Sequence, residues 1–269
     1  MTLHFAELKS RGLIDVTGQD WRAFLQGLIS NDVEGLAPGG IRFAALLTPQ
    51  GRLLFDMFVI AGPDGCRLDV EAARRDALVQ RLLIYRLRAK VEIAPVEGRV
   101  CALWGEGRPP AGWTPDPRLA ALGWRGVDAE PPAGAGIADE DAYDAHRLEL
   151  GAPDPARDCQ PDRTYPIEAN FDLLNGIDFK KGCYVGQETT SRMKRRGGIR
   201  SRMLPIVFDG PPPPEGAEVL AGELRAGEAL SGREGRAMAL LRLDRIEGAA
   251  LSVDGRPVRV DYPDWIDHG

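Results

Sequence analysis

Four consecutive prolines in the segment DGPPPPEG, residues 209–216, place the strongest single constraint on how this chain folds. Proline has no backbone N–H and a fixed φ, so such a run fits neither an α-helix nor a central β-strand and acts as a stiff boundary. Beyond it, short alternating runs such as ALSVDGRPVRVDY (250–262) follow at hairpin spacing. We therefore expect a separate C-terminal domain, residues 204–269, built as a small β-barrel or sandwich.

The preceding residues alternate between helical and strand-like patterns. Apolar residues recur at helical spacing from Trp21 to Leu28, with Asp20 as the expected N-cap. Strands are expected at 12–18, 41–48, 52–60, 66–70 and 90–95, and a second amphipathic helix at 73–89. The order β-α-β-β-β-α-β predicts an α+β fold with an antiparallel sheet.

The middle of the chain is less regular. Residues 105–136 are rich in Pro, Gly and Ala, with a strand-like RLAALGW at 118–124, and we expect them to loop out of a domain. A helix is predicted at 139–151, where it stops at a glycine. The segment 152–203 is loop-rich and carries most of the chemically reactive residue types.

Composition excludes several classes of protein. The formal net charge of −6 gives no overall attraction to nucleic acid or to a membrane. No run approaches the ~18 apolar residues of a spanning helix, and the first residues do not resemble a signal peptide. With three histidines, two of them near the termini, no metal site is predicted. We expect the four cysteines, none in a C-x-x-C pair, to be reduced thiols in the cytoplasm.

The segment KKGCYVGQET, residues 180–189, gathers the residue types of a reactive thiol site. Two lysines precede Cys183, and nearby ammonium groups favour the thiolate. Two glycines, the second of them Gly186, allow close approach of a ligand or a positive φ, while Gln187 and Glu188 add an amide and a carboxylate. The segment fits a loop that holds a polar heterocycle beside a thiol. The alternative is a buried thiol in a glycine-rich turn with solvated lysines.

A basic segment follows directly. SRMKRRGGIRSR, residues 191–202, holds six cations and no acid in a chain that is acidic overall. Such a segment can bind phosphate or RNA backbone, or the carboxylates of a small acidic ligand. The alternative is a solvated basic strand edge that blocks aggregation.

KGCYVGQE (181–188), followed by RRGG (195–198), resembles the signature of the YgfZ family of folate-binding proteins, whose mitochondrial counterpart serves iron–sulfur cluster assembly. The resemblance extends in order through FLQGLISNDV (24–33), LLTPQGRLLFDMFV (46–59), YRLRAKVEI (85–93), RLELGAP (147–153), YPIEANFDLL (165–174) and PVRVDYPDW (257–265). The family shares its fold with the aminomethyltransferase, or T-protein, of the glycine cleavage system.

This resemblance implies an aminomethyltransferase-like α+β fold with three domains around a central channel that holds tetrahydrofolate, and with a C-terminal small β-barrel. Residues 1–203 would form the folate-binding region. Its two interleaved subdomains would cover roughly 1–45 plus 140–203, and 46–139.

The resemblance also implies roles for single residues. Cys183 is the expected functional thiol, with Lys181 beside it. Asp56 matches a carboxylate near the reactive nitrogens of folate, and Glu149 matches an acid that binds the pterin, whose adjacent N–H and NH₂ groups suit one carboxylate. The alternatives are a solvent-facing strand acid for Asp56 and a helix-surface acid for Glu149. The expected folate site is completed by Tyr184, Gly186, Gln187, Glu188 and Arg192, with some of Lys194, Arg195 and Arg196 assisting.

Three functions remain in consideration. We expect a tetrahydrofolate-binding accessory protein for the assembly or repair of iron–sulfur proteins, with client or assembly proteins as partners and an indirect effect on tRNA modification. One credible thiolate does not suffice to hold a [4Fe–4S] cluster, which usually takes four. The first alternative is a folate-dependent aminomethyltransferase, which also needs a docking surface for a lipoylated carrier. The second is an RNA-binding or tRNA-modifying protein, disfavoured because the basic segment lacks interleaved aromatic residues.

Overall fold

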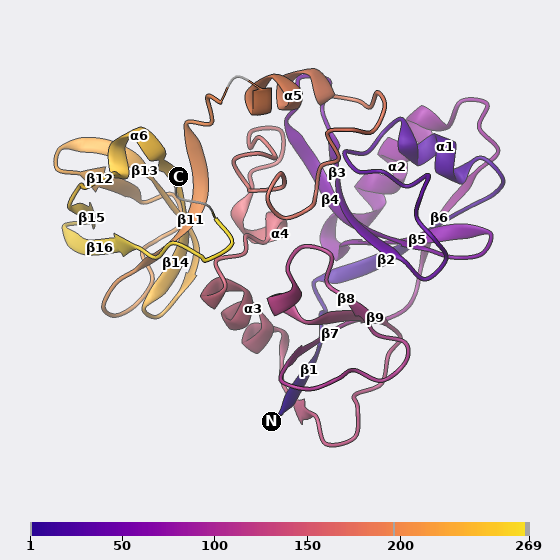
Figure 1. Ribbon diagram of the computed structural model, residues 1–269, viewed down its shortest axis with the longest axis horizontal. Helices are drawn as coiled ribbons and strands as arrows, with labels where there is room; N and C mark the ends of the chain where they lie inside the picture. Colours follow the sequence, from indigo (N-terminus) through magenta and orange to yellow (C-terminus); the bar gives the residue numbers. More distant parts are fainter. Residues whose placement is uncertain (1, 196, 267–269) are drawn as a thin grey trace.

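The computed structural model describes residues 2–195 and 197–266, and it contains two five-stranded sheets and a closed β-barrel (Figure 1). In spatial order, the first sheet comprises β10 (Gly136–Ile137), β1 (Leu3–Glu7), β7 (Val100–Gly105), β9 (Trp124–Val127) and β8 (Thr114–Pro115). The second comprises β3 (Ile41–Leu47), β4 (Leu53–Ala61), β5 (Gly65–Glu71), β2 (Arg11–Thr17) and β6 (Glu92–Val96). Within the described residues, β1 and β10 pair in parallel and the other strand pairs of these sheets are antiparallel.

The second sheet is covered on both faces, because successive side chains of a strand point to opposite sides. On β3, Ala44 and Leu46 face a core to which α1 (Trp21–Gln26) and α2 (Arg75–Arg86) contribute. Phe43, on the opposite face, stacks on Phe171 with ring centroids 4.5 Å apart. A short 3₁₀ helix, η1 (Ala72–Arg74), leads into α2.

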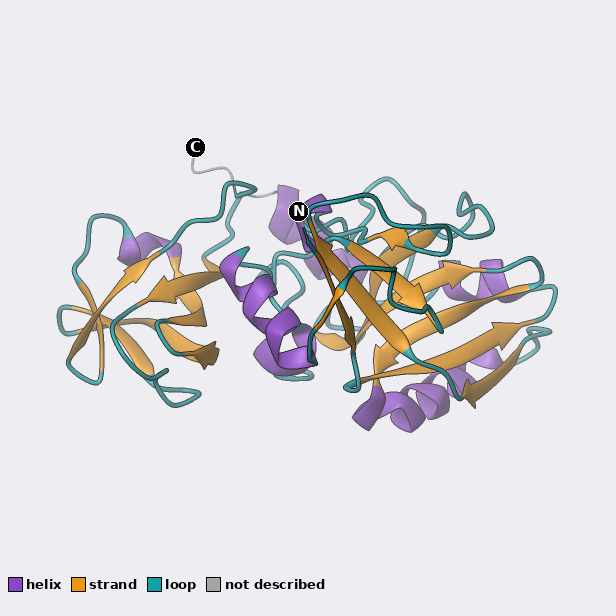
Figure 2. Cartoon of the chain, turned by 90° about the horizontal axis from the view of Figure 1, so that it is seen from below, coloured by secondary structure: helices purple, strands orange, loops and turns teal. Residues whose placement is uncertain are grey.

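The remaining helices connect the sheets to the barrel. They are η2 (Ala120–Leu122), α3 (Glu140–Glu149), α4 (Pro155–Asp158) and α5 (Gln187–Arg195). The predicted third helix is confirmed: Asp139 Oδ1 accepts from Ala142 N at 2.8 Å at its start, and Gly151 follows its end with φ +67°. Figures 1 and 2 show α3 between the sheets and the barrel.

The expected C-terminal β-barrel is confirmed. Its strands, in order around the barrel, are β11 (Ser201–Val207), β14 (Arg236–Arg242), β13 (Leu224–Arg233), β12 (Glu218–Ala221), β15 (Leu251–Val253) and β16 (Arg256–Val260), with α6 (Leu243–Ile246) after β14. The proline run is not the boundary of this domain. It connects β11 to β12 inside the barrel, because β11 already pairs with β14 and β16.

The structure corrects several expectations for the rest of the chain. Residues 105–136 do not loop out: β8 and β9 extend the first sheet, and most of the strand-like 118–124 is loop and η2. The predicted subdomain boundary at 45/46 falls inside β3, which pairs with β4 in one sheet. The sheets therefore do not follow the predicted subdomain bounds. Asp20 occupies the N-cap position of α1, as expected, but its side chain makes no capping hydrogen bond, since Oδ2 accepts from Lys90 N at 2.8 Å.

A buried set of ion pairs joins the two sheets. Arg11, at the start of β2, donates to Asp69 Oδ1 of β5 at 2.7 Å and to Asp56 Oδ2 of β4 at 3.0 Å. Arg125, on β9 of the first sheet, reaches across to Asp69 Oδ2. Burial opposes ionisation of Asp69, but the charges of Arg11 and Arg125 hold its pKa below the ordinary value.

The same set continues into the segment after β8. Arg118 donates to both carboxylate oxygens of Asp116, at 3.0 and 2.8 Å, and Arg125 Nη1 lies 3.7 Å from Asp116 Oδ2. The guanidinium groups of Arg118 and Arg125 lie 5.0 and 3.8 Å from the centroid of the Phe58 ring. Three arginines and three aspartates are thus gathered around one aromatic side chain.

We predict that Asp69→Asn lowers the free energy of unfolding by about 3–5 kcal/mol, because it leaves two buried guanidinium groups without their shared carboxylate. Asp15→Asn is the matched control, since Asp15 pairs with Arg67 at 2.8 Å on the same sheet but both side chains are about one-third exposed. That change should cost about 1 kcal/mol or less. Urea unfolding of both variants checks this, and equal losses would contradict it.

Candidate functional site

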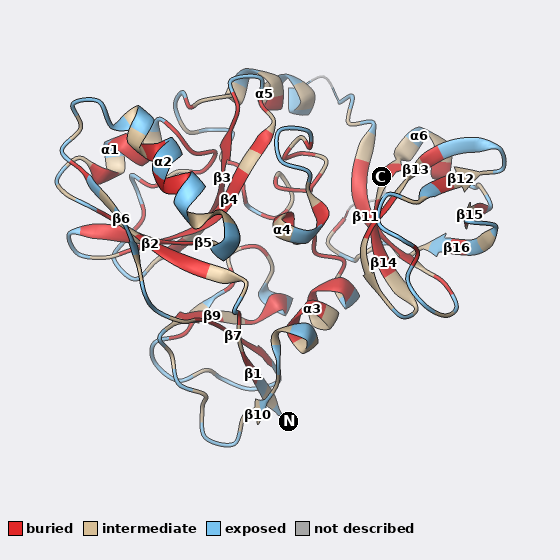
Figure 3. Ribbon diagram, turned by 180° about the vertical axis from the view of Figure 1, so that it is seen from behind, coloured by how far each residue is buried: buried red, intermediate tan, exposed pale blue. Residues whose placement is uncertain are grey.

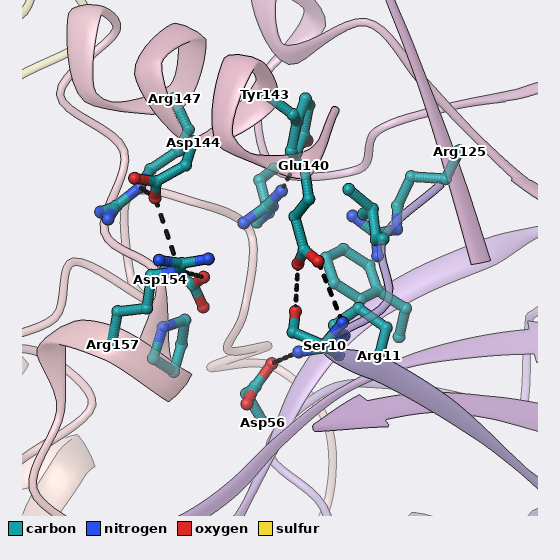
Figure 4. Close-up of a pocket in the computed structure, with 14 residues that line it drawn as sticks. Ser10, Arg11, Asp56, Arg125, Glu140, Tyr143, Asp144, Arg147, Asp154 and Arg157 are labelled. Carbon is teal, nitrogen blue, oxygen red and sulfur yellow. Dashed lines mark hydrogen bonds and ion pairs between the residues drawn. The ribbon is translucent and has the colours of Figure 1, made fainter. Parts of the chain in front are cut away.

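A cleft opens where α3 and α4 meet the second sheet (Figure 4). Its free volume is about 40 Å³, room for a few water molecules, so a larger ligand requires the lining side chains to move apart. Arg11, Asp56 and Phe58 line it from the sheets, while Tyr143 and Asp144 line it from α3. Figure 4 shows Asp56 and Arg11 on one side of the cleft and Asp144, Asp154 and Arg157 on the other.

Asp56 is positioned by the buried ion pairs. Its side chain is only 6% exposed, so the alternative of a solvent-facing strand acid is wrong. Arg11 donates to Oδ2 at 3.0 Å, and the position of Arg11 is itself fixed by three hydrogen-bonded contacts to Asp56 and Asp69. The cleft therefore contains a carboxylate with a fixed orientation.

Glu149 lies outside the cleft. It is exposed at the end of α3, which agrees with the alternative interpretation of Glu149 as a helix-surface acid. Five residues separate it from Asp144, which places the two about 140° apart around the helix axis. The acids that α3 presents to the cleft are instead Asp144 and Glu140, and Glu140 accepts hydrogen bonds from the N–H and Oγ of Ser10.

The segment 181–188 forms a second site, packed against the turn between β3 and β4. Gly186 has φ +82°, and a Cβ at this position would lie 2.4 Å from the carbonyl oxygen of Thr48. Gly51, in the facing turn, has φ +82° and would place a Cβ 2.9 Å from the carbonyl oxygen of Gly186. The two glycines are required because the backbones of the two loops touch.

Lys181 turns toward the protein interior. Its Nζ donates to the carbonyl oxygens of Ile29 and Asn31, each at 2.7 Å, and burial lowers its pKa to about 8. It also lies 5.2 Å from the centroid of the Tyr184 ring. These contacts show an anchor for the loop, and none of them joins Lys181 to the Cys183 thiol that it was expected to activate.

Cys183 is the exposed member of the four free cysteines. Burial raises the pKa of Cys66 to about 12 and that of Cys101 to about 11, and it also raises the pKa of the half-buried Cys159. The alternative of a buried thiol at position 183 is therefore wrong. Across residues 2–195 and 197–266, no group of three or more His, Cys, Asp or Glu side chains is arranged to hold a metal ion.

The other predicted site residues are distributed around the loop. Tyr184 is buried and its hydroxyl has no hydrogen-bond partner among the described residues, while burial raises its pKa to about 12. Gln187 starts α5, and its Oε1 accepts from Tyr184 N at 3.3 Å. Glu188 and Arg192 are exposed on α5. Arg196 lies outside the described residues.

The basic segment is also divided by the fold. Arg192, Lys194 and Arg195 belong to α5 and are exposed, so this part is a helix and not the edge strand of the alternative reading. Arg202 lies on β11, where it is buried and donates to both carboxylate oxygens of Asp172 at 2.9 Å.

The structure groups Lys181, Tyr184, Gly186 and Gln187 in one loop and places Asp56 in a cleft lined by other residues. Sequence reasoning did not find the arginines of that cleft. Arg11, Arg118 and Arg125 come from three separated segments with no common motif, and two of them lie in the stretch expected to loop out. The sequence offered no signal for this convergence.

Comparison with known structures identifies the fold. The chain matches the glycine cleavage system aminomethyltransferase T from Bartonella henselae with a TM-score of 0.79, over 98% of this chain and 86% of that one, at 18% identity. The fold is therefore aminomethyltransferase-like, as expected. Residues 200–268 match the family model described as the CAF17 C-terminal beta-barrel domain.

Sequence comparison shows the family. The chain is 33% identical to the human mitochondrial iron–sulfur cluster assembly factor IBA57, with 96% of this chain and 84% of the human protein covered. It is 34% identical to the IBA57 homologue of Mycosarcoma maydis, over 79% of this chain. The chain belongs to the IBA57 family of iron–sulfur cluster assembly factors. It spans 60% of the length of the Mycosarcoma relative and 58% of that from Neurospora crassa.

The names of these relatives place them in mitochondria. The cytoplasmic location expected for this chain stays a prediction. Among the described residues, no helix has the length and apolar character needed to cross a membrane.

We predict that Gly186→Ala lowers the free energy of unfolding by about 1–3 kcal/mol, because the methyl group meets the Thr48 carbonyl and the positive φ is strained. Gly182→Ala, four residues earlier, is the control: its Cβ would meet no heavy atom within 4 Å. Its effect should stay within about 0.5 kcal/mol. Thermal unfolding measures both, and comparable effects would refute the contact between the loops.

Lys181 gives a prediction for pH dependence. Its folded pKa of about 8 lies below the ordinary 10.5, so between these values the unfolded chain binds more protons than the folded one. The contribution of Lys181 to stability should therefore rise with pH across this window. The free energy of unfolding of the wild type minus that of Lys181→Met, measured by urea unfolding, should show this rise between pH 7 and 9.5. The corresponding difference for Lys180→Met, at an exposed position, should not rise with pH. A difference for Lys181→Met that stays constant or falls with pH would contradict the prediction.

Proposed function

We propose that this protein is an accessory factor for the assembly or repair of iron–sulfur proteins, that it binds tetrahydrofolate in the Asp56 cleft, and that it uses the Cys183 thiol on partner proteins. The observation that carries the proposal is the exposure of Cys183 in a chain whose other cysteines are shielded. Membership of the IBA57 family supports the iron–sulfur part, because the relatives are named as cluster assembly factors.

The thiol acts together with a partner. An iron–sulfur cluster is usually held by several cysteine thiolates, and one exposed cysteine supplies one. Cys183 therefore contributes either one ligand to a cluster whose remaining ligands come from the partner, or a thiolate that attacks a disulfide of the partner. The anchoring of the loop by Lys181 and Gly186 keeps the thiol at the surface without occupying it in internal contacts.

The cleft suits the pterin ring of tetrahydrofolate in its chemistry, and side chains that line it must move to admit the ring. A pterin presents N–H and NH₂ donors on a flat ring, and Asp56 supplies a carboxylate acceptor whose orientation Arg11 fixes. From α3 the acceptor is Asp144 or Glu140 in place of the expected Glu149. In this role Arg11 orients the Asp56 carboxylate. The exposed cations Arg192, Lys194 and Arg195 are available to a negatively charged glutamate tail or partner surface.

An effect on tRNA modification follows indirectly from this proposal. Where a tRNA-modifying enzyme is itself an iron–sulfur protein, loss of the accessory factor lowers its activity without any contact between this chain and RNA. The proposal thus needs no nucleic-acid site.

The iron–sulfur part is tested in a strain that lacks its own member of the family. We predict that wild-type protein restores the activities of several iron–sulfur enzymes and that Cys183→Ser does not, although it folds normally, because the lost thiol is exposed. Cys159→Ser is the control and should restore them. Full restoration of the enzyme activities by Cys183→Ser would contradict the thiol mechanism.

The folate part is tested by calorimetry and thermal unfolding. Tetrahydrofolate at ten times its dissociation constant should raise the free energy of unfolding by about 1.4 kcal/mol. Asp56→Asn should weaken binding at least ten-fold, whereas Glu149→Gln should leave it within two-fold because that side chain lies outside the cleft. Absence of binding to the wild type, or the reverse order of the two variants, would count against this site.

A further inference from the structure

The end of α2 carries a surface feature that the proposed function does not use. The helix ends at Arg86, and Ala89 N donates to Arg86 O at 2.7 Å, which closes a tight turn over residues 86–89. Leu87, the first central residue of this turn, has φ +42° and ψ −105°. These are close to the angles of the first central position of a type II′ turn, which glycine normally occupies.

The leucine at this position is not explained by packing. Its side chain is 88% exposed, so it contributes nothing to the core that would offset a positive φ. A glycine would relieve the backbone strain without loss of buried contacts. Residues held in strained conformations without structural benefit are concentrated at functional sites, and this backbone conformation directs the side chain to the surface.

Leu87 belongs to a larger exposed surface (Figure 3). Ile84, one turn earlier on α2, is 66% exposed. Four exposed cations lie on the same helix end and turn: Arg81, Arg86, Arg88 and Lys90. Within the part of the chain that the structure describes, none of these four side chains forms an ion pair or a hydrogen bond. We call these six residues the α2 surface. The exposed Glu92 and the Asp20 carboxylate adjoin them, so the segment carries an excess of positive charge.

The charge of this surface is opposite to that of the chain as a whole. The protein has a net charge of −6, and its other buried and half-exposed arginines are mostly paired with carboxylates. Four unpaired cations around two exposed apolar side chains are complementary to an acidic surface with an apolar pocket.

We propose that the α2 surface binds an acidic partner protein, with Leu87 inserted in an apolar pocket and the four cations around it paired with carboxylates. One exposed leucine at a turn, with one isoleucine beside it, favours a protein pocket over a lipid bilayer, where several apolar residues along one helix face would be needed. RNA is disfavoured because no exposed aromatic side chain accompanies the cations. The inference is independent of the Asp56 cleft and of Cys183.

The first test separates strain from binding. Leu87→Gly should raise the melting temperature by about 2–4 °C, because it relieves the positive φ, whereas a residue with a packing role would lower it. A lower melting temperature would overturn the assignment of Leu87 as a strained, unpacked side chain.

The second test identifies the occupant. A photo-crosslinking amino acid at position 84 is introduced in the family-deficient strain, and the same amino acid at Leu224 of the barrel, 64% exposed, is the control. We expect one discrete protein adduct from position 84 and none from 224, and the adduct should be lost with Leu87→Gly and with Arg86→Glu plus Arg88→Glu. The captured protein, once purified, should be acidic and should bind the wild type at least ten-fold more tightly than either variant, with an affinity that falls as salt rises.

Three results would overturn the proposal. One is the absence of a protein adduct at position 84. Another is an adduct with lipid or RNA in its place. The third is a protein adduct that both sets of substitutions leave unchanged.

Discussion

Asp69 is shared between arginines from two different sheets, and the centre of the molecule is arranged around this contact. Arg11 belongs to the same sheet as Asp69, while Arg125 comes from the first sheet. A buried carboxylate is tolerable only when cations and hydrogen bonds replace its hydration, so both arginines must be in place for the chain to fold. Nη1 of Arg11 then orients Asp56. Arg125 connects these ion pairs to the pair formed by Asp116 and Arg118. The relative placement of the sheets and the orientation of the cleft carboxylate thus have one common cause.

The barrel is tied to this centre by a second polar set. Arg147 of α3 pairs with Asp144 and Asp158 and donates to Ser231 Oγ of β13 at 2.7 Å. Asp144 also lines the cleft, so the helix that contacts the barrel is the one that presents acids to the proposed folate site. The thiol is supported differently, on a loop held by Lys181 and by the contact between Gly51 and Gly186. In our account, ligand binding and thiol chemistry therefore depend on separate sets of contacts, which single substitutions can separate.

Much of this architecture could be predicted, and the failures have a physical pattern. Alternation and helical periodicity are local, so they located α2, α3 and the strands of the barrel. Of the two glycines in segment 181–188, Gly186 has the positive φ that the sequence allowed for, whereas Gly182 has neither a positive φ nor a close neighbour. Convergence of Arg11, Arg118 and Arg125 is a long-range property that no local pattern encodes. The prediction for Glu149 was wrong because matching a sequence block fixes a position along α3 but does not show which face of the helix lines the cleft. The expectation that Lys181 activates the thiol was not supported, because proximity in sequence to Cys183 does not determine which way the lysine side chain points.

The central claim is that the buried ion pairs prepare Asp56 to bind tetrahydrofolate. A crystal structure of the protein with tetrahydrofolate tests it most directly. We predict the pterin ring hydrogen-bonded to the Asp56 carboxylate, with the contacts of Arg11 and Arg125 to Asp69 unchanged. A pterin bound elsewhere, or bound in this cleft only after those contacts have broken, would contradict the account.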